Sequence, residues 1–488
     1  MNRSVRLIQP AASPVLVMAK VRHTVSPAAP WKRAASLSLS VAALLTLGGA
    51  IALVTTGFAV GVRSIVDPEA AAWLDQWLPA TGGITPRDLK TVAQLRAELT
   101  KGNQRMGEIV PLGRQWLVAT VRQQQPNCTA GPQCWPIVQL RAYQAPNPEP
   151  QGDRPLAYRL TTTLDLEGPP ESLVLAPLVK AGVATSGSTD PLPLMAVQGL
   201  KGGPAGGGWL TVSGQLPRSN QQLRYGVIVH LNISRLGRPG HLSVQGQWSS
   251  PKDRSPVWES ITGNREPELI VDQSATDAPD LAIYRAIPSG FAPDPVSLEP
   301  IVLTEPLLRS TDLTDLAQYQ EALKLVKLEL WSPALSKLQP LRDRLVNRSL
   351  VWDDRVQAQY DALRYHADLA RVRADSPQKD IPSQILADLG DSRWQRALDR
   401  FAQASLGDQT TVVRWLRSAE GEKLERQVNL VLQFAPNQAS VMFWKATTLA
   451  ARQGRPAAIA WYRSQPGQSV EWDQRIDRWL AQVATVPR

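Results

Sequence analysis

The stretch LAQYQEALKLVKLELWSPALSKL, from Leu316 to Leu338, decides the fold of the carboxyl-terminal part of the chain. Its apolar residues recur at spacings of three and four, which is the period of amphipathic helices. We therefore expect two successive helices here, from Leu316 to Leu330 and from Ser332 to Val346. The same spacing of apolar residues continues to the end of the chain, and glycine is scarce throughout this part. Residues 304–488 are therefore predicted to be an all-α domain.

Further helices are expected throughout this domain. Their predicted limits are Trp352 to Ala374, Pro382 to Leu389, Trp394 to Ala404, Thr411 to Arg417, Gly421 to Phe434, Ala439 to Gln453, Pro456 to Gln465 and Val470 to Val483.

Small residues repeat along these helices at fixed offsets. The offsets of Ala322, Leu325, Ala334 and Leu338 recur as Ala446, Leu449, Ala458 and Tyr462, with a partial copy at Ala397, Phe401 and Ala404. Trp331 and Trp394 each stand three residues before an alanine of the pattern. These offsets resemble those of tetratricopeptide-type solenoids over about 170 residues, which implies stacked helical hairpins. The glycine expected in that family's first helix is missing, and a generic helical bundle stays open.

Residues 106–303 have the pattern of a mainly antiparallel β domain. Short apolar runs are separated by Gly, Pro, Asn and Asp, and helical periodicity is absent. The predicted strands are Gln115 to Arg122, Ile137 to Tyr143, Leu156 to Leu166, Trp209 to Gly214, Tyr225 to Ile233, His241 to Trp248, Glu268 to Asp272 and Leu281 to Ile287. A propeller, a sandwich and a meander all fit, although no regular repeat of a propeller's length is visible.

A membrane anchor is expected from Ala34 to Val62, a span of 29 residues without a charge. Roughly 20 apolar residues suffice to cross a bilayer as a helix. Residues 1–33 precede it as a flexible tail with six Lys and Arg and no acid, and positive residues are retained on the cytoplasmic side. The apolar stretch is too long for a cleaved signal peptide. We therefore predict a single-pass protein with its amino terminus in the cytoplasm, followed by a juxtamembrane helical linker over residues 63–105.

Gly57 and Gly61 form a GxxxG spacing, which lets two membrane helices approach closely. Because this spacing also arises by chance in glycine-rich spans, we do not expect dimerisation through it.

The net charge of +10 reflects this topology. The tail carries six of the excess positive charges, which leaves +4 for the remaining 455 residues. Nucleic-acid binding needs a dense basic patch, so no nucleic-acid partner is expected.

Cys128 and Cys134 are the only cysteines, and the segment between them contains the turn formers Gly131 and Pro132. A disulfide between them is expected, because the predicted compartment is oxidising.

No pattern predicts catalysis, a cofactor or a metal site. The glycine-rich run from Lys201 to Gly208 leads into a strand and not into the helix that a phosphate loop requires. Ser249 and Lys252 match a Ser-x-x-Lys spacing without the accompanying motifs. His230 and His241 have no further ligands at metal-binding spacing. We therefore expect a protein that is not an enzyme.

Several short sequence segments after the anchor resemble those of an uncharacterised group of single-span cyanobacterial membrane proteins. They are Pro191 to Gly199, Tyr225 to His230, Gln453 to Pro456 and Ala458 to Trp461. The resemblance implies a periplasmic or thylakoid-lumenal body and assigns no role to any residue.

Two functions compete at this point. A helical stack tethered to a membrane fits a protein-interaction scaffold with an unknown protein partner, and Trp331, Trp394, Ala334, Ala397 and Ala458 are then interaction or packing residues. The alternative is a glycan-binding or hydrolytic envelope module in the β domain, motivated by 16 tryptophans.

Overall fold

The computed structural model describes residues 89–126, 128, 131–145, 156–218, 221–233, 240–263, 266–276, 278–289, 296–348, 351–465, 476–477 and 479–481. The described residues all belong to one compact unit, Ile84–Arg488. The predicted tail, the span Ala34 to Val62 with Gly57 and Gly61, and most of the predicted linker lie outside the described residues. Among the residues that are described, no helix is both long and apolar enough to cross a membrane.

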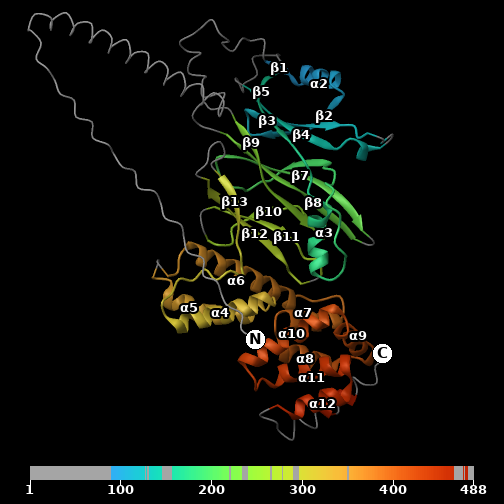
Figure 1. Cartoon of the computed structure of the whole chain (residues 1–488), viewed down its shortest axis with the longest axis vertical. Helices are drawn as coiled ribbons and strands as arrows, with labels where there is room; N and C mark the ends of the chain where they lie inside the picture. Colours follow the sequence, from blue (N-terminus) through green and yellow to red (C-terminus); the bar gives the residue numbers. More distant parts are fainter. Residues whose placement is uncertain are drawn as a thin grey trace, which may run out of the picture. The chain divides into compact units, whose positions relative to one another are not determined.

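The amino-terminal part of this unit is built from antiparallel sheets (Figure 1). Within the described residues, the sheets have the strand orders β1-β5-β4-β3-β2, β6-β7-β8-β9 and β10-β11-β12-β13, named here the first, second and third sheets. Apart from β1, neighbouring strands in each sheet are consecutive in the chain, so each sheet is a meander. The strands are β1 Lys90–Thr91, β2 Gln104–Leu112, β3 Trp116–Gln123, β4 Ile137–Gln144, β5 Ala157–Asp165, β6 Ala196–Gly199, β7 Gly207–Arg218, β8 Gln221–Asn232, β9 His241–Ser250, β10 Val257–Glu259, β11 Glu268–Asp272, β12 Leu281–Pro288 and β13 Val296–Pro300.

The second sheet is covered on both faces, and the alternation of its side chains shows how. In β8, Val227 and Val229 pack with side chains of the first sheet, whereas Ile228 packs with Leu269 and Val271 of the third. Successive side chains of a strand point to opposite faces, so the second sheet is the middle layer of the three.

The outer layers are helical. Leu117 and Ala119 of β3 pack against Leu95 of α2 (Val92–Lys101). At the other end, Ile270 and Ile283 of the third sheet pack against Ala362 of α6 (Asp354–Asp375).

The helical part follows the predicted order closely. Its members are α4 Leu313–Lys327, α5 Trp331–Leu345, α6, α7 Ile381–Gly390, α8 Trp394–Gln403, α9 Leu406–Leu416, α10 Ala419–Phe434, α11 Ala439–Gln453 and α12 Arg455–Arg463. Amphipathic periodicity located most of them because they bury one stripe in a shared core. In α11, by contrast, every residue from Ser440 to Ala451 is buried. The predicted α+β class, with an antiparallel β region before a helical stack, is therefore confirmed.

The β region contains a helix that was not predicted, α3 (Glu171–Lys180), which buries Val174, Leu175 and Leu178 between the first and second sheets. Pro177 inside this helix hides its periodicity. The described end of the predicted linker contains α2, which packs on the first sheet. The Thr91 hydroxyl caps α2 by accepting a hydrogen bond from the backbone N–H of Gln94. In turn, the side-chain oxygen of Gln94 accepts one from the backbone N–H of Thr91.

The strands missing from the predicted set share a position. They are β1, β2, β6, β10 and β13, and each lies at the edge of its sheet. Four of them, β1, β6, β10 and β13, have two to five residues each, too few for a recognisable alternation, and β2 is interrupted by Gly107 and Pro111.

Candidate functional site

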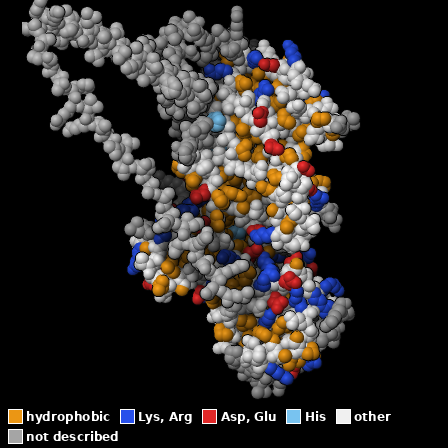
Figure 2. All heavy atoms as spheres, viewed as in Figure 1, with side chains coloured by type: hydrophobic (Ala, Val, Ile, Leu, Met, Phe, Trp, Pro, Cys, Tyr) orange, Lys and Arg blue, Asp and Glu red, His pale blue; other side chains and the backbone are white. Residues whose placement is uncertain are grey.

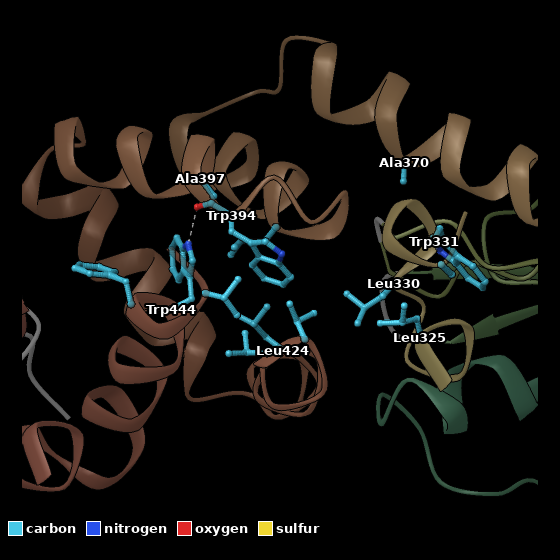
Figure 3. Close-up of a cluster of buried hydrophobic side chains, with 14 of the residues drawn as sticks. Leu325, Leu330, Trp331, Ala370, Trp394, Ala397, Leu424 and Trp444 are labelled. Carbon is cyan, nitrogen blue, oxygen red and sulfur yellow. Dashed lines mark hydrogen bonds between the residues drawn. The ribbon is translucent and has the colours of Figure 1, made fainter. Parts of the chain in front are cut away.

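The tryptophans and alanines singled out in the helical part are packing residues. Trp331 and Trp394 begin α5 and α8, and the side chains of Ala334, Ala397 and Ala458 are fully buried. Figure 3 shows Trp331 and Trp394 within one cluster of buried side chains, and the indole of Trp444 donates a hydrogen bond to the carbonyl of Trp394 at 3.0 Å. None of these five side chains is free to bind a partner.

Cys128 and Cys134 are joined by a disulfide in the connection between β3 and β4. The Arg122 guanidinium holds this connection by donating to the carbonyl oxygens of Trp135, at 2.9 Å, and Met195, at 2.6 Å. The bridge thus closes a loop that is tied to the entry of the second sheet.

The tryptophans of the β region do not form an exposed row. Trp116, Trp209, Trp248 and Trp258 are buried, and partly buried Trp135 lies beneath the Arg105 guanidinium at 3.8 Å. Within the described part of the chain, no group of His, Cys, Asp or Glu is arranged to hold a metal ion. The glycan-binding alternative therefore has no aromatic platform among these residues.

A cluster that sequence reasoning missed lies where the third sheet meets the helices. We call it the junction and define it by Lys180, Asp280, Glu329, His366 and Lys423. The Lys180 ammonium lies 2.7 Å from the Asp280 carboxylate and 3.7 Å from that of Glu329, which also pairs with Lys423. These ion pairs connect α3, the start of β12, the turn after α4 and α10.

Glu329 holds an unusual backbone conformation in this cluster. Its φ is +58°, and the amide of Leu330 donates to the carbonyl of Leu325 at 3.0 Å, which closes α4 with a left-handed cap. Glycine is the usual residue at such a position, because a side chain costs about 1 kcal/mol there. The carboxylate of Glu329 is thus held at the junction by a turn that glycine would form more easily.

A small cavity lies beside these ion pairs. Its volume is about 40 Å³, and its walls are Ala278, Pro279, Glu329, Trp331, Ala370, Arg373, Ala387, Gly390, Lys423 and Gln427. That space suits a few water molecules, at roughly 10–15 Å³ each, and is too small for a metabolite.

His366 is the buried titratable group of the junction. Its side chain is 1% exposed, neither ring nitrogen has a hydrogen-bond partner in the described structure, and the ring stacks on Trp331 with centroids 4.4 Å apart. Burial lowers the pKa of His366 to about 4, and the charge of Lys180 adds to this effect. The negative charge of Glu329 and the backbone of Leu281 oppose it. The imidazole is therefore neutral at neutral pH.

The sequence offered one signal for this cluster. His366 occupies a position of the apolar stripe of α6, beside Ala362, Ala367 and Ala370, but a lone histidine on such a stripe has no pattern that announces a role. The lysines and carboxylates come from segments up to 243 residues apart, so only the fold brings them together.

Comparison with models of protein families finds no match, and a search of curated proteins finds none either. The function is therefore argued from the architecture and the chemistry of the chain itself.

Proposed function

We propose that this chain is a membrane-tethered protein-interaction scaffold without catalysis or cofactor. The predicted helix Ala34 to Val62 anchors it, the amino terminus is cytoplasmic, and the body lies in the periplasm or the thylakoid lumen. We assign it to the uncharacterised single-span cyanobacterial group that its sequence segments resemble.

The observation that carries the proposal is the recurrence of helical hairpins along the stack. Backbone φ is positive at Glu329, Ser392 and Gly454, which lie 63 and 62 residues apart. At each position one helix ends and its partner begins, giving the pairs α4 and α5, α7 and α8, and α11 and α12. Stacked helical hairpins are typical of solenoids, which present extended concave surfaces for binding other proteins.

Alanines at the helix crossings support a tetratricopeptide-like packing. Ala322 and Ala334 of the first pair are buried in the shared core, and Ala446 and Ala458 occupy the same offsets in the last pair. All four are essentially fully buried, as close approach of paired helices requires.

The surface of the helical part also suits protein partners. Figure 2 shows Lys and Arg side chains interspersed with Asp and Glu over this face of the helices. A mixed surface of this kind supports a protein partner over nucleic acid, which needs a concentrated basic patch.

Site-specific photocrosslinking in membranes tests the proposal. A photoreactive amino acid is placed singly at Leu313, Val372 or Leu406, which are 81%, 61% and 66% exposed on the helical part. We expect reproducible covalent adducts with one protein species from at least one of these positions.

Matched probes on the β region provide the control. Val183 and Val244 are 55% and 46% exposed there. Adducts from the helical positions alone support the scaffold, whereas no protein adduct from any helical position, with retention of the chain on isolated cell-wall glycan, would overturn it.

A further inference from the structure

The junction joins the β layers to the helical stack through contacts on both sides of His366. Toward the sheet, Ile270 and Ile283 pack against Ala362, one turn before His366 on α6. The Tyr365 hydroxyl donates to the Glu259 carboxylate at 2.5 Å, and the Gln359 amide donates to the carbonyls of Val302 and Glu305 at 2.8 and 2.9 Å. The buried imidazole thus follows directly after the residues by which α6 contacts the third sheet and the segment that leaves it.

The charged side chains around the imidazole already form ion pairs with one another. Glu329 offers the nearby negative charge, but it is shared between Lys180 and Lys423, and Asp280 is paired with Lys180. From α5 the ring meets the indole of Trp331, and from β12 it meets the backbone at Leu281. An imidazolium formed here would have the backbone of Leu281 as a hydrogen-bond partner but no counterion of its own, and it would be a buried charge close to Lys180, which is costly.

We propose that the junction is a pH-sensitive latch, in which protonation of His366 releases α6 from the third sheet and frees the helical stack from the β layers. Opening exposes the imidazole to water and lets Glu329 and Lys180 separate. The cavity contributes by leaving this side of the junction less densely packed, since its walls include Glu329 and Trp331, the residue on which the imidazole stacks. The inference stands apart from the scaffold proposal, because it concerns only how two parts of the chain are held together.

The direction of the pH dependence of opening follows from the pKa of His366 in the closed and in the open junction. In the closed junction the pKa of His366 is about 4, and on opening it returns to about 6.5. Between these values the open state binds more protons, so acidification favours opening, and below about pH 4 the effect levels off because both states are protonated. Going from pH 7 to pH 5 should raise the population of the open state roughly twenty-fold.

Hydrogen–deuterium exchange of the full-length chain, corrected for the intrinsic pH dependence of exchange, measures this opening. We expect protection in β12 and α6 to fall about twenty-fold between pH 7 and pH 5, while protection in α11 stays constant. In His366→Phe, which keeps an aromatic ring against Trp331 but cannot be protonated, protection in β12 and α6 should not change with pH.

His241→Phe is the matched control, because it removes a partly exposed imidazole of β9 outside the junction. It should respond to pH as the unaltered chain does. An equal loss of protection in His366→Phe, or no loss in the unaltered chain, would overturn the proposal. If His366→Phe does not fold, NMR of ¹³C-labelled histidine in the unaltered chain decides: a His366 signal that titrates near pH 6.5 without loss of protection also overturns it.

Discussion

At the scale of single residues, the turns that close α4 and α7 show where the chain accepts backbone strain. Ser392 has a φ of +60°, and the amide of Arg393 donates to the carbonyl of Asp388 at 2.8 Å, as Leu330 does to Leu325 in the first turn. At Glu329 the ion pairs of the carboxylate with Lys180 and Lys423 offset the cost of the left-handed backbone conformation. Ser392 has no comparable contact, since its hydroxyl is buried without a hydrogen bond in the described structure.

Ser392→Gly should therefore stabilise the chain by about 0.5–1 kcal/mol, because glycine adopts this backbone conformation freely and leaves no unsatisfied hydroxyl. Chemical denaturation monitored by circular dichroism measures the change. Ser336→Gly is the control: it lies on the exposed face of α5, where glycine should destabilise by a similar amount. A loss of stability in Ser392→Gly would show that the turn is not strained.

Ala397→Leu tests the close helix contacts inferred from the alanine pattern. Ala397 is fully buried, so the larger side chain should cost about 1–3 kcal/mol through overpacking. Ala402→Leu adds the same atoms on the exposed face of the same helix and should be nearly neutral. Equal stabilities of the two variants, measured by the same denaturation, would argue against tight packing at the Ala397 crossing.

At the scale of elements, the sequence pattern located every helix of the stack from α4 to α12 and the central strands, but it failed at particular places. The edge strands β1, β6, β10 and β13 are too short to show an alternation, Gly107 and Pro111 interrupt β2, and Pro177 interrupts α3. The junction could not be predicted, because its ion pairs join elements that only the stacking of layers brings together. Local periodicity predicts single helices and strands, whereas this cluster forms only when several of them are packed together.

The disulfide between β3 and β4 gives a prediction for one element. Cross-linking so short a loop should contribute about 2 kcal/mol by restricting the unfolded chain. We expect a reductant to lower the thermal unfolding temperature of the native chain to that of the variant carrying both Cys128→Ser and Cys134→Ser. Because these are the only cysteines, the reductant should leave that variant unchanged, and ready thiol labelling of the unreduced folded protein would contradict the bond.

At the scale of the whole molecule, the proposed topology makes the anchor the dividing line between compartments. Alkaline phosphatase fused after Trp77 should be active, because the enzyme needs an oxidising compartment, and a fusion at residue 30 should be inactive. Colony assays on a chromogenic phosphate, normalised to the amount of fusion protein, measure the difference. Activity at residue 30 alone would reverse the orientation.

The middle position of the second sheet also changes what specifies its strand register. In a sheet with one solvent-exposed face, a slip by one residue would expose the apolar side chains. In the buried middle of β7 and β8 both faces are covered, so the contrast between polar and apolar faces discriminates little between registers. Size takes over this role: Gly226 is paired with Ser213, and a methyl group at Gly226 would lie 2.1 Å from the carbonyl oxygen of Val212. Gly214 similarly leaves room for the ring of its partner Tyr225. In this layer, the positions of the glycines therefore determine the register in which the strands pair.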